Sequence, residues 1–154
     1  MQPARLRYFN VFRVASYLLV LYTLGHTLGA VVETPRFGFE SDAVVALMKS
    51  VHVKVQSADC TWYGFYRGFG ILVSIYFAFS AFAAWYLGSD GGRVESVLRP
   101  IAWALFLGHL AGALIAWVYF FPVPIVFSTA ITVLLGYGCF QRRQSHGQEA
   151  RVHV

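Results

Sequence analysis

The chain has 154 residues, of which 58% are hydrophobic and only 12% are charged. Soluble domains carry about 25% charged residues, so a soluble globular domain is excluded as the interpretation. The net charge of +5 does not indicate nucleic-acid binding, because the basic residues lie at the ends of apolar segments and form no stripe. The two cysteines form no CxxC pair, which disfavours a membrane thiol oxidoreductase. The composition predicts an integral membrane protein surrounded by a lipid bilayer.

Four apolar runs predict membrane-spanning helices, at residues 14–32, 64–87, 101–121 and 124–140. Each has about 17 to 24 residues, the length a helix needs to cross roughly 30 Å of hydrocarbon. The predicted fold class is therefore all-α, an integral membrane four-helix transmembrane bundle. We expect a single transmembrane domain over residues 1–140, followed by a mobile polar tail at 141–154.

The basic residues predict the orientation of the spans. They lie before the first span (Arg5, Arg7, Arg13), between the second and third (Arg93, Arg99) and after the fourth (Arg142, Arg143, Arg151). Cytoplasmic loops carry an excess of Lys and Arg. Both termini are therefore expected in the cytoplasm, and the segment 33–62 on the outer side.

The outer segment 33–62 is predicted to contain a short amphipathic helix on the membrane surface. Apolar residues recur there at helical spacing, at Val44, Leu47, Met48, Val51 and Val55. Ser41 and Asp42 are the expected N-cap of this helix.

Three outer residues are candidates for a surface role. His52 lies beside the apolar face of the expected amphipathic helix, and Asp59 and Trp62 stand just before the second span. We expect Asp59 to cap the second span and Trp62 to anchor it at the level of the lipid headgroups.

Ionisable residues inside the spans are costly in hydrocarbon and are therefore functional candidates. They are His26, Arg67 and His109, in the first three spans. Each lies in or beside a pair of glycines four residues apart, namely Gly25 and Gly29, Gly64 and Gly68, and Gly108 and Gly112. Small residues at this spacing let helix backbones approach closely, so we expect these faces to point into the bundle.

His26 and His109 lie at similar expected depth, within the short matching stretches at residues 25–30 and 108–113. Two such histidines meet the requirement for axial ligation of a b-type haem, with Arg67 beside a propionate. The same pair would give a transition metal an incomplete set of ligands. The favoured alternative is structural, with each histidine hydrogen-bonded to a neighbouring helix. The expected hydroxyl partners are Ser74, Ser128, Thr129 and Thr132.

A polar pocket towards the outer side is a second hypothesis. Its candidate residues are Tyr22, His26 and Glu33 on the first helix, Arg67 and Ser74 on the second, His109 on the third and Thr132 on the fourth. If Glu33 neutralises Arg67, the cluster is structural, which is favoured over a ligand-binding role.

The stretches Trp62-Tyr63-Gly64-Phe65-Tyr66-Arg67-Gly68-Phe69-Gly70 and Gly25-His26-Thr27-Leu28-Gly29 resemble segments of small bacterial membrane proteins. In overall plan the chain is similar to the DoxX-like group. The resemblance covers roughly the first 90 residues. It implies a four-helix bundle in the bacterial inner membrane and transfers no catalytic residue.

The leading functional hypothesis is a non-catalytic membrane protein that binds a lipophilic ligand or another membrane subunit, including a second copy of itself. The alternative is a membrane redox subunit or enzyme with a cofactor held by His26 and His109. No phosphate-binding loop, HExxH motif or nucleophile elbow is present in the sequence. A channel is disfavoured, because four short helices enclose little room.

Overall fold

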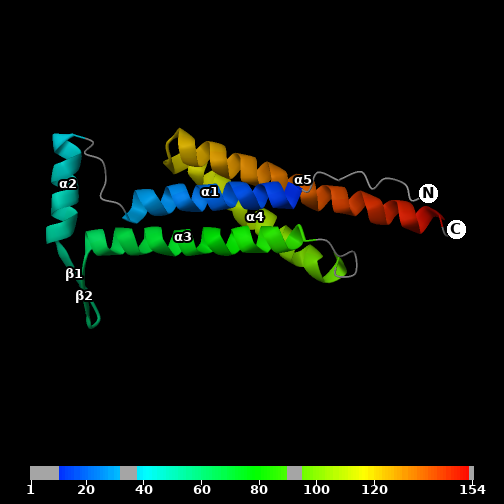
Figure 1. The fold of residues 1–154 in the computed structure, drawn as a ribbon. Coiled ribbons are helices and arrows are strands. Elements are labelled where there is room, and N and C mark those ends of the chain that lie inside the picture. Colours follow the sequence, from blue (N-terminus) through cyan, green and yellow to red (C-terminus); the bar gives the residue numbers. More distant parts are fainter. Residues whose placement is uncertain (1–10, 32–37, 90–94, 153–154) are drawn as a thin grey trace. The chain divides into compact units, whose positions relative to one another are not determined.

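The computed structural model describes residues 11–31, 38–89 and 95–152. The elements in chain order are α1 (Val11–Val31), α2 (Phe39–Ser50), β1 (His52–Val55), β2 (Ala58–Thr61), α3 (Trp62–Leu87), α4 (Glu95–Tyr119) and α5 (Pro122–Val152), as labelled in Figure 1. The described chain is helical apart from one antiparallel hairpin between β1 and β2.

Four of the helices are long and apolar enough to cross a membrane. Their candidate spans are Val11–Gly29, Trp62–Leu87, Leu98–Tyr119 and Pro122–Phe140. The predicted all-α class with four transmembrane helices is therefore confirmed. The helix α5 continues to Val152, whereas the predicted fourth span ended at Phe140, where the apolar stretch also stops. The mobility of the tail stays a prediction.

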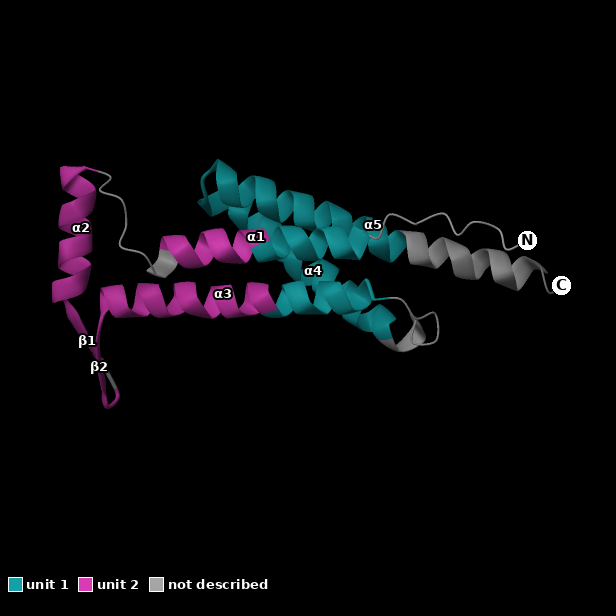
Figure 2. Ribbon diagram, viewed as in Figure 1, with its two compact units in different colours: residues 1–20, 79–154 teal, residues 21–78 magenta. Residues whose placement is uncertain are grey.

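The chain divides into two compact units, coloured separately in Figure 2. Unit 1 comprises residues 1–20 and 79–154, and unit 2 comprises residues 21–78. The first part of α1 and the last part of α3 thus belong to unit 1, together with α4 and α5.

In unit 1, a buried hydroxyl group joins α1 to α3. Ser16 Oγ donates a hydrogen bond of 2.8 Å to the carbonyl oxygen of Ala81. The side chains of Leu19 and Leu87 are fully buried in the same unit. In hydrocarbon no water competes for such a bond, so a single serine can hold two helices together.

Two glycines of α5 allow close packing inside unit 1. A Cβ atom on Gly136 would lie 2.8 Å from the ring of Phe106 on α4. A Cβ atom on Gly138 would lie 2.6 Å from the ring of Phe12 on α1. Both distances are shorter than real contacts permit, so each glycine makes room for an aromatic ring of a neighbouring helix.

Within their own units, the glycine pairs that were expected to face inward make no close contact with a neighbouring helix. Among the described residues, no atom lies within 4 Å of the position that a Cβ would take at Gly25, Gly29, Gly68, Gly108 or Gly112. At Gly64 the nearest atom is the hydroxyl oxygen of Thr61, the residue just before α3. The close contacts at Gly136 and Gly138 are instead made with phenylalanine rings.

In unit 2, the segment between the first two spans contains a shorter helix than expected. The helix α2 ends at Ser50, and residues 52–55 form β1 instead of continuing it. Polar and apolar residues alternate from His52 to Val55, which is the period of a strand. The prediction of one helix through Val55 is therefore wrong.

The caps in this segment also differ from those expected. The residue before α2 is Gly38, whose φ of 111° is rarely adopted by L side chains, and Ser41 and Asp42 lie inside the helix. At α3 the hydroxyl oxygen of Thr61 accepts a hydrogen bond of 3.0 Å from the backbone N–H of Gly64. Thr61, and not Asp59, is thus the N-cap of α3.

The glycine packing in unit 1 gives a testable expectation. Gly138→Ala places a methyl group against the ring of Phe12 and should lower the free energy of unfolding by about 1 to 3 kcal/mol. The matched control is Gly112→Ala, whose new methyl group meets nothing within 4 Å. Thermal unfolding in a mild detergent measures both. Equal melting temperatures for the two variants would contradict the packing described for Gly138.

Candidate functional site

The polar contact between α1 and α3 in unit 2 contains two of the predicted site residues. His26 Nδ1 lies 3.0 Å from Ser74 Oγ, and Ser74 Oγ donates a bond of 3.1 Å to the carbonyl oxygen of Gly70. Ser74 is buried and His26 is half-buried. The arrangement is the one given above as the structural alternative to a metal-binding role for His26.

Two aromatic rings, those of Tyr22 and Phe77, lie beside this contact. The ring of Tyr22 lies 4.7 Å from that of Phe77, and the edge of the His26 ring meets Phe77 at 5.6 Å between centroids. Residues 22 and 26 share one face of α1, and residues 74 and 77 share one face of α3. The predicted site residues Tyr22, His26 and Ser74 are therefore brought together.

The expected ion pair between Arg67 and Glu33 falls partly outside the described residues. Arg67 is half-buried on α3, and Glu33 lies outside the part of the chain that the structure describes. The predicted pairing of Glu33 with Arg67 stays a prediction.

The other predicted interior residues belong to unit 1. Thr132 Oγ1 contacts two carbonyl oxygens, that of His109 at 3.0 Å and that of Ser128 at 2.7 Å. The bond between α4 and α5 thus uses the backbone of His109. The threonine is buried, so it fastens these two helices.

The haem hypothesis pairs residues of different units, since His26 belongs to unit 2 and His109 to unit 1. Among the described residues no group of three or more His, Cys, Asp and Glu side chains is arranged to hold a metal ion. Ligation of a haem or metal by the two histidines stays a prediction. A visible absorption spectrum before and after dithionite tests it, since a Soret band lost in His26→Ala would support haem binding.

The three candidates for a surface role, His52, Asp59 and Trp62, lie in or next to the hairpin. His52 Nδ1 and Asp59 Oδ1 are 2.7 Å apart, and both side chains are more than half exposed. The register pairs His52 with Thr61 and Lys54 with Asp59, so these four residues share one face of the hairpin. Trp62, the first residue of α3, is exposed. An exposed pair of this kind contributes little to stability, about 0 to 1 kcal/mol.

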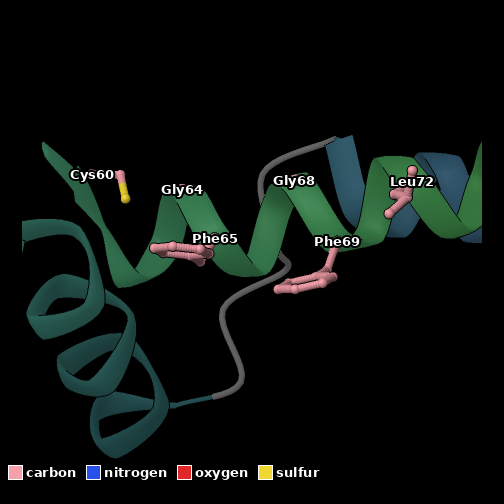
Figure 3. A pocket seen from close by; sticks show the side chains of 6 residues that line it. All are labelled: Cys60, Gly64, Phe65, Gly68, Phe69 and Leu72. Carbon is pink, nitrogen blue, oxygen red and sulfur yellow. The ribbon is translucent and has the colours of Figure 1, made fainter. Parts of the chain in front are cut away.

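An apolar groove that the sequence analysis did not anticipate runs along the first turns of α3. It has a volume of about 310 Å³ and is lined by Cys60, Gly64, Phe65, Gly68, Phe69 and Leu72. Figure 3 shows these residues following one another along α3, with Cys60 at the end of β2. The two glycines keep the helix surface low between the larger side chains. The groove was not predicted, because the spacing of Gly64 and Gly68 is also typical of contacts inside a helix bundle.

The groove and the polar contact lie on different sides of α3. Successive residues of a helix are rotated by about 100°, so Gly68 and Ser74, which are six residues apart, lie about 120° from each other around the helix axis. Gly64, Gly68 and Leu72 form one stripe, and Gly70, Ser74 and Phe77 form the other. The site residues predicted for a polar pocket therefore do not line this groove.

Arg13 makes the most extensive polar contact of unit 1. Its Nε donates a bond of 3.1 Å to the carbonyl oxygen of Gly88, and one terminal nitrogen donates a bond of 3.0 Å to Ser89 Oγ. The guanidinium carbon lies 3.6 Å from the centre of the Trp85 ring, whose other contact is the edge of Tyr17. From the sequence, Arg13 was expected only to contribute to the orientation of the spans.

Comparison with protein-family models, with curated proteins and with the solved structures gave no match. The resemblance to the DoxX-like group therefore stays a prediction.

The contacts of Arg13 predict a loss of stability on substitution. Arg13→Ala should lower the free energy of unfolding by about 2 kcal/mol, because it removes two hydrogen bonds and the stacking on Trp85. Arg13→Lys should recover only part of this loss, since a lysine cannot donate in two directions from a planar group. Arg99→Ala, at an exposed position of α4, is the control. Melting temperatures in detergent measure the stability of each variant. A melting temperature of Arg13→Lys equal to that of the wild type would contradict the described contacts of Arg13.

Proposed function

We propose that this protein is a non-catalytic, multi-pass membrane protein that binds a lipophilic ligand in the groove on α3. The observation that carries the proposal is the groove itself, whose lining residues Cys60, Gly64, Phe65, Gly68, Phe69 and Leu72 offer an almost wholly apolar surface. Ligand pockets are concave and mostly apolar, with volumes of about 300 to 1,000 Å³. The volume of about 310 Å³ is at the lower end of this range.

The position of the groove suits a molecule that enters from the membrane. The apolar span of α3 begins at Trp62, so Gly64 to Leu72 occupy its first part. The rise from Gly64 to Leu72 is about 12 Å, which accommodates a substantial part of an acyl or prenyl chain. Cys60, on the hairpin, marks the end of the groove that lies outside the apolar span.

Filling the groove tests this proposal. Gly68→Leu places a branched side chain in the groove and should reduce co-purified lipophilic ligand about tenfold, as measured by mass spectrometry of the extract from protein in mild detergent. The control is Gly108→Leu on α4, since Gly108, like Gly68, has no atom of the described residues within 4 Å of its Cβ position. Equal ligand content in the two variants contradicts the proposal, as does a wild-type extract without any stoichiometric lipophilic molecule.

We further propose that the protein resides in the bacterial inner membrane with both termini in the cytoplasm. The distribution of basic residues around the spans supports this orientation. The hairpin with Cys60 then lies on the outer side.

Thiol labelling of intact cells tests the orientation. A membrane-impermeant maleimide should label Cys60 in a Cys139→Ser variant without permeabilisation. In a variant that carries Cys60→Ser, Cys139→Ser and Ser145→Cys, labelling should require permeabilised cells. The reverse pattern would overturn the orientation. Cys139 itself is a poor reporter, because it is buried.

A further inference from the structure

The connection between α4 and α5 is short and wholly apolar. The two residues between these helices are Phe120 and Phe121, which follow Tyr119 and precede Pro122. Turns at an aqueous surface are rich in Asn, Asp, Ser and Gly, whose side chains or backbones suit both the turn and water. No Asp, Glu, Lys or Arg occurs anywhere in residues 100–140. The composition of this turn therefore indicates an apolar environment.

Contacts along the whole length of α4 and α5 join the two helices into one hairpin. Near the turn, Trp117 Nε1 donates a hydrogen bond of 3.1 Å to Thr129 Oγ1. At the far end, the rings of Trp103 and Phe140 lie 5.3 Å apart between centroids. Between these two levels lies the bond that Thr132 donates to the backbone of α4. All of these residues belong to unit 1, so the position of the turn is set by the two helices that it connects.

The lengths of the two helices place the turn at the boundary of the hydrocarbon. The apolar part of α5 begins at Pro122 and stops before Gln141 and Arg142, where the sequence becomes polar. Its 19 residues rise about 28 Å, close to the roughly 30 Å of hydrocarbon in a bilayer. In α4 the rise from Arg99 to Tyr119 is about 30 Å. With the charged ends of both helices at one boundary of the bilayer, neither helix is long enough to carry the turn into water at the other.

Two prolines lower the cost of keeping the start of α5 away from water. The first four N–H groups of a helix have no partner within that helix. Pro122 and Pro124 have no N–H group, so two of these four donors are absent. The N–H group of Phe120 donates a bond of 3.0 Å to the carbonyl oxygen of Ala116. This turn therefore has fewer backbone donors that require water than an ordinary connection between helices.

We propose that the α4–α5 turn, residues 119–124, is an interaction surface for lipid and lies among the lipid molecules, below the aqueous surface of the membrane. The side chains of Tyr119, Phe121 and Val123 are exposed in the structure and contact the acyl chains near the glycerol groups. Tyrosine is enriched at this level, because its ring is apolar and its hydroxyl group reaches the headgroups. The turn belongs to unit 1, so this inference does not rest on the groove of unit 2.

Spin labels measure this placement in the full chain, reconstituted in vesicles of phosphatidylcholine. A nitroxide is attached at Phe121→Cys in a background that carries Cys60→Ser and Cys139→Ser. The control label is at Ser57→Cys, an exposed position in the polar turn between β1 and β2. Oxygen, which concentrates in hydrocarbon, should collide readily with the label at Phe121→Cys. The polar complex of nickel with ethylenediaminediacetate should reach that label about tenfold less than it reaches the control, because hydrocarbon excludes polar solutes.

Each of the other two results would overturn the proposal. If the nickel complex reaches Phe121→Cys as readily as Ser57→Cys, the turn lies in water. If neither oxygen nor the nickel complex reaches Phe121→Cys, protein and not lipid covers the turn. A second label at Val123→Cys, in the first turn of α5, should give the same result as Phe121→Cys and replaces it if that variant does not fold.

Discussion

The structure depends on hydrogen bonds made by single hydroxyl groups to backbone carbonyl oxygens. Ser16 bonds to Ala81 between α1 and α3, and Thr132 bonds to His109 between α4 and α5. Apolar side chains do not drive helices together in lipid, because the lipid tails are equally apolar. Each polar contact of this kind contributes about 0.6 to 2 kcal/mol in membranes, and it also specifies which faces of the helices meet. Close packing at Gly136 and Gly138 adds the van der Waals contacts that such helices need.

Serine hydroxyl groups also hold the ionisable side chains His26 and Arg13 in place. Ser74 both donates to Gly70 and contacts His26, so one serine satisfies its own helix and orients a histidine of the neighbouring one. Ser89 does the same at the other end of α3, where it donates to Trp85 and accepts from Arg13. At Ser89 the serine oxygen must accept, because the guanidinium of Arg13 can only donate.

The spans were predictable from the sequence, but the positions of the contacts were less so. Hydropathy depends on composition over about 20 residues, so the four helices were found with end points within a few residues. Ser128 and Thr132, expected from the sequence to bond to a neighbouring helix, are both buried, and Thr132 bonds to the backbone of α4. The contacts of the glycines were not predictable, because a glycine can make room for a backbone, for an aromatic ring or for an open groove, and its local sequence does not distinguish these. The hairpin was missed because Val44 to Val55 fit a helical period well enough to conceal the alternation that begins at His52.

The contact between Arg13 and Gly88 has a consequence for the order of assembly during synthesis. The two residues are 75 positions apart in the chain. At about 5 to 20 residues per second, roughly 4 to 15 s separate the appearance of the arginine from that of its carbonyl partner. During that interval the start of the first helix holds a charge without its final acceptors, which favours keeping the guanidinium at the aqueous boundary. Once α3 is complete, the guanidinium can bond to Gly88 and Ser89. The rate of synthesis therefore sets the earliest time at which these two helices can pair through Arg13.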